Sequence, residues 1–88
     1  MTALRFIIQG RVQGVGFRYF VLYQARQLGV KGYVKNQPDG SVLVEAVGDE
    51  SAVYRLAELC RQGPPLARVT GFSVNDALLT DYDSFEIR

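Results

Sequence analysis

The chain has 88 residues and a mass of 9.8 kDa; 48% of its residues are hydrophobic and 22% are charged. These values predict a single folded domain, residues 1–88, and exclude disorder as the main state. Ten basic and nine acidic residues leave a net charge of +1. The chain therefore lacks the overall positive charge of proteins that bind nucleic acid or an anionic membrane.

The histidine and cysteine counts limit the chemistry that the chain can perform. There is no histidine, which removes the commonest general acid and base and most zinc sites. The single cysteine, Cys60, allows no internal disulfide and favours a reducing compartment. No apolar run reaches the roughly 18 residues of a membrane span, and the first eight residues lack the apolar stretch of a signal peptide. We expect a cytoplasmic protein that needs no metal ion or other cofactor.

The first elements follow from the spacing of apolar residues. Leu4, Phe6 and Ile8 alternate with Arg5, Ile7 and Gln9, a period of two that predicts a strand with at least one buried face. Glycines mark residues 11–16 as a loop. Over residues 17–28 apolar side chains recur at spacings of three and four, which predicts a helix that ends at the next glycine. Tyr19 and Tyr23 are expected to be partly buried on this helix.

A hairpin is predicted next. Residues 30–36 have the alternation of a second strand, and residues 41–47 that of a third. Between them, Gln-Pro-Asp-Gly at 37–40 predicts a turn, because proline presets φ and glycine supplies a positive φ. The two strands are therefore antiparallel. On the third strand Glu45 is expected to point away from the valine-rich face.

The second half repeats a helix and a strand. A helix is expected after Asp49, its N-cap, and before a Gly-Pro-Pro sequence. Its apolar stripe includes Cys60, which is expected to be a core residue and not a nucleophile. Residues 67–74 predict a fourth strand with a bulge near Gly71, where the alternation slips. Residues 85–87 can form a short final strand.

This order of elements predicts the fold class. A βαββαβ order with a terminal strand indicates an α+β, ferredoxin-like split βαβ sandwich: a mostly antiparallel sheet of four to five strands with two helices on one face. Fold alone says little about function. An RNA-binding module would need aromatic residues on the 41–47 strand and a basic face. A metal chaperone of this fold would need a Cys-x-x-Cys motif, and neither feature is present.

The segment 10–18, Gly-Arg-Val-Gln-Gly-Val-Gly-Phe-Arg, is a candidate anion site. It lies between the end of a strand and the start of a helix, where backbone N–H groups are unpaired and the helix dipole is positive. Arg18 adds a planar, charged fork that matches a phosphate. A solvated glycine-rich connection is the alternative. A cation in the first helical turn opposes the dipole, however, and an anion between them would resolve the conflict.

The segment 32–36, Gly-Tyr-Val-Lys-Asn, runs directly into the predicted turn. Taken alone, Asn36 is more typical of a residue that starts a turn by bonding to its own backbone than of a functional residue. Topology alone also does not require the end of this strand to lie near the 10–18 loop. The segment becomes informative only in combination with the first one.

Together the two segments resemble a known family. Residues 8–18, Ile-Gln-Gly-Arg-Val-Gln-Gly-Val-Gly-Phe-Arg, are similar to the first acylphosphatase signature. Residues 32–36, followed by Gly40, Val42 and Gly48, are similar to the second, with its spacing intact. Length and element order also fit, so that the resemblance covers essentially the whole chain.

The resemblance implies a site and a reaction. The phosphate would be bound by Gln13, Gly14, Val15, Gly16, Phe17 and Arg18, through backbone N–H groups and the Arg18 guanidinium. Asn36 would position the attacking water. The reaction implied is hydrolysis of the carboxyl-phosphate bond of small acyl phosphates such as acetyl phosphate, carbamoyl phosphate or bisphosphoglycerate, which yields inorganic phosphate without a metal.

The chemistry of these residues agrees with that reaction. A carboxylate is a good leaving group, and phosphoryl transfer depends mostly on positioning and charge stabilisation. The missing general acid and base is then no obstacle, because the phosphate itself can take the proton of the water. The alternative is a non-catalytic module that binds acyl or carbamoyl phosphate for a larger carbamoyl-transfer system. The length of the chain favours a free enzyme, which we expect to be a monomer.

Overall fold

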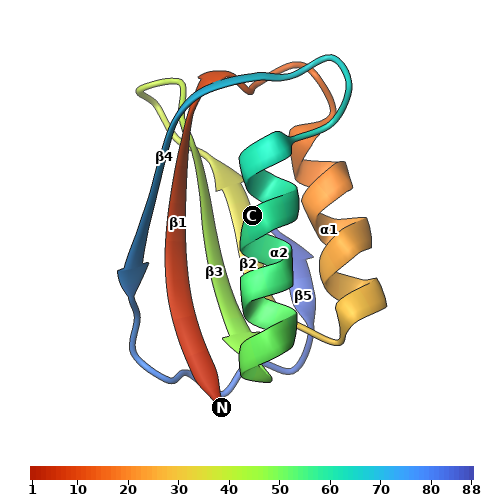
Figure 1. Cartoon of the computed structure of the whole chain (residues 1–88), viewed down its shortest axis with the longest axis vertical. Coiled ribbons are helices and arrows are strands. Elements are labelled where there is room, and N and C mark those ends of the chain that lie inside the picture. Colours follow the sequence, from red (N-terminus) through yellow and green to blue (C-terminus); the bar gives the residue numbers. More distant parts are fainter.

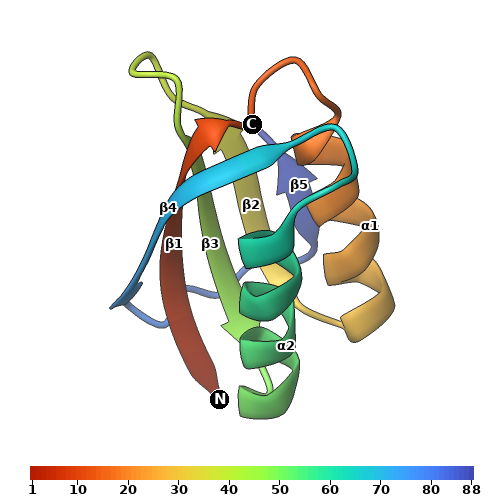
Figure 2. The same ribbon diagram turned by 45° about the horizontal axis from the view of Figure 1, so that its top comes forward.

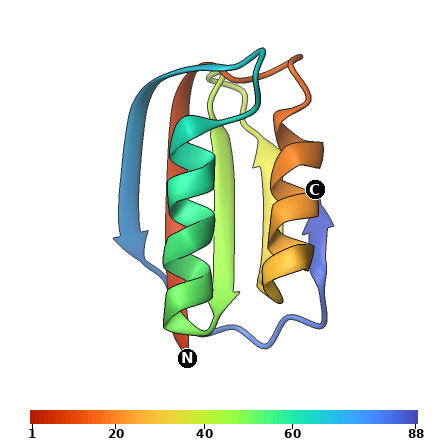
Figure 3. The ribbon, with the colours of Figure 1, turned by 45° about the vertical axis from the view of Figure 1, so that its right-hand side comes forward.

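The computed structural model describes residues 1–88 as a five-stranded sheet with two helices on one face (Figures 1 and 3). The strands are β1 (Thr2–Arg11), β2 (Lys31–Asn36), β3 (Val42–Gly48), β4 (Arg68–Asp76) and β5 (Phe85–Ile87), and the helices are α1 (Phe17–Leu28) and α2 (Glu50–Gln62). The strand order is β4-β1-β3-β2-β5, antiparallel throughout except for the parallel pair β2 and β5. The ferredoxin-like α+β fold is confirmed.

The core lies between the sheet and the helices, where the predicted apolar faces meet. Phe6 and Ile8 of β1 are fully buried, and so are Val21 of α1 and Leu56 of α2. Alternate strand residues point to opposite faces, and helical residues three and four apart share a face, so these patterns leave few alternative packings. Cys60 is also fully buried in this core, as predicted. Neither helix has the length and hydropathy needed to span a bilayer.

Two local predictions are refined by the structure. Asp49 is the N-cap residue of α2, but its side chain makes no capping hydrogen bond. The predicted bulge in β4 falls at Thr70, beside Gly71, because Gln9 pairs with Gly71 while the next residue of β1 pairs with Val69. The extra residue restores the inward direction of the apolar side chains after the slip in alternation.

The prediction for two tyrosines is wrong. Tyr19 and Tyr23 have exposed fractions of 69% and 61%, and neither is partly buried as expected. The buried residues of α1 are Phe17, Val21 and Ala25. Each tyrosine lies two positions after one of them, which is about 200° around a helix of 3.6 residues per turn. The helical period therefore puts both rings on the solvent side.

The topology brings the two sequence motifs to one end of the sheet. Both β1 and β2 run antiparallel to the strand between them, β3, and are therefore parallel to each other. The loop that follows β1 and the turn that follows β2 must then lie at the same end of the sheet, as Figure 2 shows. Asn36 is the last residue of β2 and is thereby brought toward the start of α1.

Candidate active site

The loop between β1 and α1 owes its shape to two glycines. Gly14 has a φ of 73° and Gly16, the N-cap of α1, has a φ of 78°, so both are left-handed. Nothing lies within 4 Å of a Cβ built at either position. Glycine is therefore favoured here by the backbone conformation and not by a lack of space. Two left-handed residues so close together turn successive N–H groups toward a common side, as in anion-binding nests.

The N–H groups of this loop have no acceptor within the protein. None of the backbone N–H groups of residues 13–19 donates a hydrogen bond to another group of the chain. The last of them belong to the first turn of α1, which carries the positive end of the helix dipole and has no acidic residue. Arg18 adds a full positive charge in the same turn. This end of α1 is electropositive and offers many donors to an anion.

A small cavity of about 170 Å³ joins this loop to the end of β2. Its walls are formed by Val12, Gly14, Gly16, Phe17, Arg18, Tyr19 and Asn36. Asn36 is the residue of β2 in this lining, and Arg18 belongs to the first turn of α1. The candidate phosphate ligand Arg18 and the candidate water ligand Asn36 therefore line the same cavity, which topology alone did not guarantee.

The side chain of Asn36 is not used by the turn. Its Oδ1 atom is buried and has no hydrogen-bond partner in the protein. Asp39 closes the turn instead, because its carboxylate accepts from the N–H and the hydroxyl of Ser41 at 2.9 and 2.6 Å. An unpaired buried amide oxygen costs about 1–3 kcal/mol unless a ligand donates to it. The interpretation of Asn36 as a turn-starting residue is thus wrong.

The structure separates the predicted phosphate-binding residues into two groups. Gly14, Gly16, Phe17 and Arg18 line the cavity, whereas Gln13 and Val15 do not. Val15 packs against the hydrophobic core. Gln13 directs its side-chain amide to the turn after β2, where it donates to two backbone carbonyls. For these two residues the backbone N–H remains the only group that can face an anion.

Sequence reasoning missed two residues of the cavity wall. Val12 is buried and belongs to the core, and the residues expected to bind the phosphate began only at the next position, Gln13. Tyr19 directly follows Arg18, and its wrong assignment to a partly buried helix face concealed that it lies at the site. Correct use of the helical period would have put it on the exposed side of the first turn.

Other parts of the molecule are weaker candidates for an active site. A larger hollow of about 350 Å³ lies at the opposite end of the sheet, near Met1 and Gly48, and neither Arg18 nor Asn36 lines it. No three Cys, Asp or Glu residues are grouped so that they could hold a metal ion. Burial raises the pKa of the Cys60 thiol far above its usual value, and its nucleophilic thiolate is therefore not formed at neutral pH. The loop with Arg18 and Asn36 is the candidate active site.

Comparison with known proteins shows the family of the chain. The family model for acylphosphatase matches residues 4–87. The chain is 51% identical over 87 residues to an acylphosphatase of Archaeoglobus fulgidus, a match that covers 99% of this chain and 98% of the relative. It is 49% identical over 88 residues to an acylphosphatase of Thermotoga maritima, covering 100% and 98% of the two chains.

Solved structures give the same result. The crystal structure of acylphosphatase from Bacillus subtilis superimposes with a TM-score of 0.96 at 42% identity and covers 100% of this chain and 99% of that one. Full-length HypF, in a phosphate- and nucleotide-bound form, contains a similar region with a TM-score of 0.92 at 30% identity. That match covers 99% of this chain but 12% of HypF. The chain therefore belongs to the acylphosphatase family of hydrolases.

Proposed function

We propose that the chain hydrolyses the carboxyl-phosphate bond of small acyl phosphates at the 13–18 loop. One observation carries this proposal: the unpaired N–H groups of the loop, the guanidinium of Arg18 and the unpaired Oδ1 of Asn36 belong to one small cavity. The first two bind an anion, and the third accepts a hydrogen bond from a water. These are the two tasks that phosphoryl transfer to water requires.

The reaction needs little more than positioning. A water held by Asn36 attacks the phosphorus atom, and the bond from phosphorus to the acyl oxygen breaks. The carboxylate leaves with the bonding electrons, and a proton of the water passes to a phosphate oxygen. Arg18 and the loop N–H groups stabilise the charge on the other phosphoryl oxygens. Each such donor is typically worth about 2.7–4 kcal/mol in a transition state.

The roles of the residues follow from their donors and acceptors. Arg18 presents a fork that is always charged, and it suits two oxygens of one phosphate. The amide of Asn36 can accept from the water with Oδ1 while its NH₂ donates to a phosphate oxygen. No side chain is required as general acid, because the leaving group is a stabilised carboxylate. The leaving group of an alkyl phosphate monoester is a far more basic alkoxide. We therefore expect the chain not to hydrolyse such esters.

The substrates proposed share their phosphate end. Acetyl phosphate, carbamoyl phosphate and bisphosphoglycerate all contain the same mixed anhydride. The groups of the proposed site, which are the loop N–H groups, Arg18 and Asn36, serve the phosphate end and the attacking water. We propose that the chain, residues 1–88, acts as a single monomeric domain. The cytoplasm is the compartment expected for a chain whose one thiol is unpaired.

A second candidate function comes from the likeness to HypF. Part of that larger protein has this fold, and the alternative is that the chain serves only as an acyl- or carbamoyl-phosphate-binding module. The relatives named acylphosphatase match over nearly their whole length, however, at higher identity. Catalysis by the isolated chain is therefore the better supported of the two.

The test is release of inorganic phosphate from acetyl phosphate by the purified chain. We expect turnover well above the spontaneous rate, competitive inhibition by inorganic phosphate, and no turnover of an alkyl phosphate monoester such as glycerol phosphate. Binding of phosphate without turnover would favour the module instead. The absence of both phosphate binding and turnover would overturn the assignment of the site.

A further inference from the structure

The side chain of Gln13 joins the phosphate loop to the turn after β2. Its Nε2 atom donates to the backbone oxygen of Gln37 at 2.8 Å and to that of Ser41 at 2.9 Å. A primary amide has two N–H groups, so both are used. These are the only hydrogen bonds made by a side chain of residues 12–18, and they link the loop to residues far along the chain.

The turn that Gln13 contacts is itself closely bonded. The N–H of Gln37 donates to the oxygen of Ser41 at 2.9 Å, and the N–H of Gly40 donates to the oxygen of Gln37 at 3.1 Å. The side-chain amide of Gln37 also donates to the hydroxyl of Ser41 at 3.0 Å. Gln13 therefore bonds to a preformed turn, at the residue that directly follows Asn36.

We propose that Gln13 is a positioning residue that holds the phosphate loop and Asn36 in one fixed geometry. The inference rests on the proposed function. Asn36 receives no hydrogen bond on its Oδ1 from the protein, and its position relative to the loop depends on the backbone at the end of β2. Gln13 binds that backbone one residue further on. A displacement of about 1 Å between water and phosphorus can cost about a hundredfold in rate.

This role differs from that of the Gln13 N–H group. The N–H is one of several donors to the phosphate, and a side-chain substitution leaves it in place. Removing the two side-chain hydrogen bonds of Gln13 is then expected to impair the in-line attack of the water more than phosphate binding. The signature is a lower kcat with little change in inhibition by inorganic phosphate.

The experiment compares wild type, Gln13→Met and Asn36→Ala with the double variant. Methionine matches glutamine in length but has no donor. We expect Gln13→Met to lower kcat for acetyl phosphate by about tenfold or more. In the Asn36→Ala background the same change is expected to cost less than threefold, because Gln13 acts through Asn36. The control is Gln27→Met, an exposed position on α1 without side-chain hydrogen bonds, which is expected to keep the wild-type kcat.

Two results would overturn the inference: a normal kcat in Gln13→Met, or equal fold losses in the two backgrounds. If Gln13→Met does not fold, Gln13→Ala provides the comparison, since its short side chain has no donor for the two carbonyls and adds no charge beside the phosphate loop. A wild-type chain without acetyl phosphate turnover would refute the proposed function first. Turnover in wild type with no effect at Gln13 would refute only the positioning role.

Discussion

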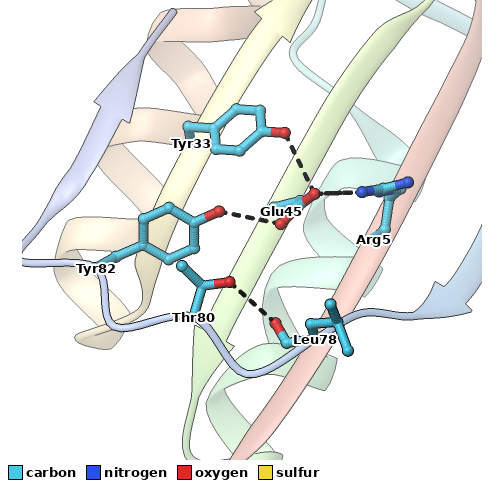
Figure 4. A network of polar contacts seen from close by, with 6 residues as sticks. All are labelled: Arg5, Tyr33, Glu45, Leu78, Thr80 and Tyr82. Carbon is cyan, nitrogen blue, oxygen red and sulfur yellow. Dashed lines mark hydrogen bonds and ion pairs between the residues drawn. The ribbon is translucent and has the colours of Figure 1, made fainter.

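The guanidinium of Arg5 binds the carboxylate of Glu45 on the sheet face that is turned away from the helices (Figure 4). The two residues are register partners of β1 and β3. The same carboxylate accepts from the hydroxyl of Tyr33 on β2 at 3.2 Å and from that of Tyr82, just before β5, at 3.0 Å. Arg88 completes the cluster, 4.4 Å above the ring of Tyr33. One buried carboxylate thus ties the C-terminal segment to the central strands.

This cluster predicts a loss of stability in acid. Burial alone would raise the pKa of Glu45, but hydrogen bonds from Arg5, Tyr82 and Tyr33 and the charge of Arg5 outweigh it and hold the pKa below the usual 4.5. A lowered folded pKa stabilises the protein above pH 4.5, and this contribution is lost as the pH falls through the folded pKa. The free energy of unfolding should therefore decrease on acidification from pH 6 to 3.

The variant Glu45→Gln isolates this effect. It should lower the free energy of unfolding at pH 7 by about 1–2 kcal/mol, because charge-assisted hydrogen bonds become neutral ones. Its stability should also fall less between pH 6 and 3 than that of wild type, as measured by urea unfolding. Glu58→Gln, at an exposed position of α2 without side-chain hydrogen bonds, is the control. An unchanged acid dependence in Glu45→Gln would assign the acid sensitivity to other carboxylates.

Sequence patterns were sufficient to predict the helices and strands, because apolar residues recur with a regular period along each of them. The alternation around Phe6 and the stripe that includes Cys60 both lie where the pattern put them. The burial of Glu45 was not predictable, since alternation puts it on the outer face, and only side chains from three other segments cover it there. The role of the Gln13 side chain was equally hidden. Its acceptors are backbone carbonyls, which any sequence provides.

Replacement of Cys60 should affect stability and not catalysis. The side chain is fully buried in the core and does not line the cavity. Cys60→Ala should lower the free energy of unfolding by about 1–2 kcal/mol through the small cavity it leaves. The value of kcat should stay as in wild type, and thiol reagents should not inactivate the folded protein. A large fall in kcat at unchanged stability would restore the thiol as a candidate nucleophile.

Replacement of Arg18 should remove both binding and turnover. Arg18→Gln deletes the only full positive charge among the residues that line the cavity. We expect kcat/KM for acetyl phosphate to fall by about a hundredfold or more, with much weaker inhibition by inorganic phosphate. Arg26→Gln, an exposed position in the last turn of the same helix, is the control and should keep its activity. Near-normal activity in folded Arg18→Gln would exclude this loop as the active site.

Chelators should have no effect on the reaction. The proposed transition state is stabilised by a guanidinium and by backbone N–H groups, which EDTA does not touch. Turnover of acetyl phosphate should be equal with EDTA, with added magnesium and with neither. Loss of activity in EDTA, restored by magnesium, would show that a metal ion performs the charge stabilisation that we assign to Arg18.

Replacement of Asn36 should separate chemistry from binding. If its buried Oδ1 orients the attacking water, Asn36→Ala removes an interaction that matters mainly in the transition state. The value of kcat should then fall by about a hundredfold, while inhibition by inorganic phosphate changes little. Stability should not decrease, because the side chain makes no hydrogen bond that its loss would break, and the removal of an unpaired buried oxygen is itself favourable.

A turn role would give the opposite pattern. The variant would keep its kcat and lose about 1 kcal/mol of stability, which would require a local hydrogen bond that the structure does not show. Because kcat, phosphate inhibition and the urea midpoint can be measured on one preparation, the two outcomes cannot be confused. A normal kcat with a lowered urea midpoint would remove Asn36 from the site. It would also remove the group through which Gln13 is proposed to act, and only the anion-binding loop with Arg18 would then remain.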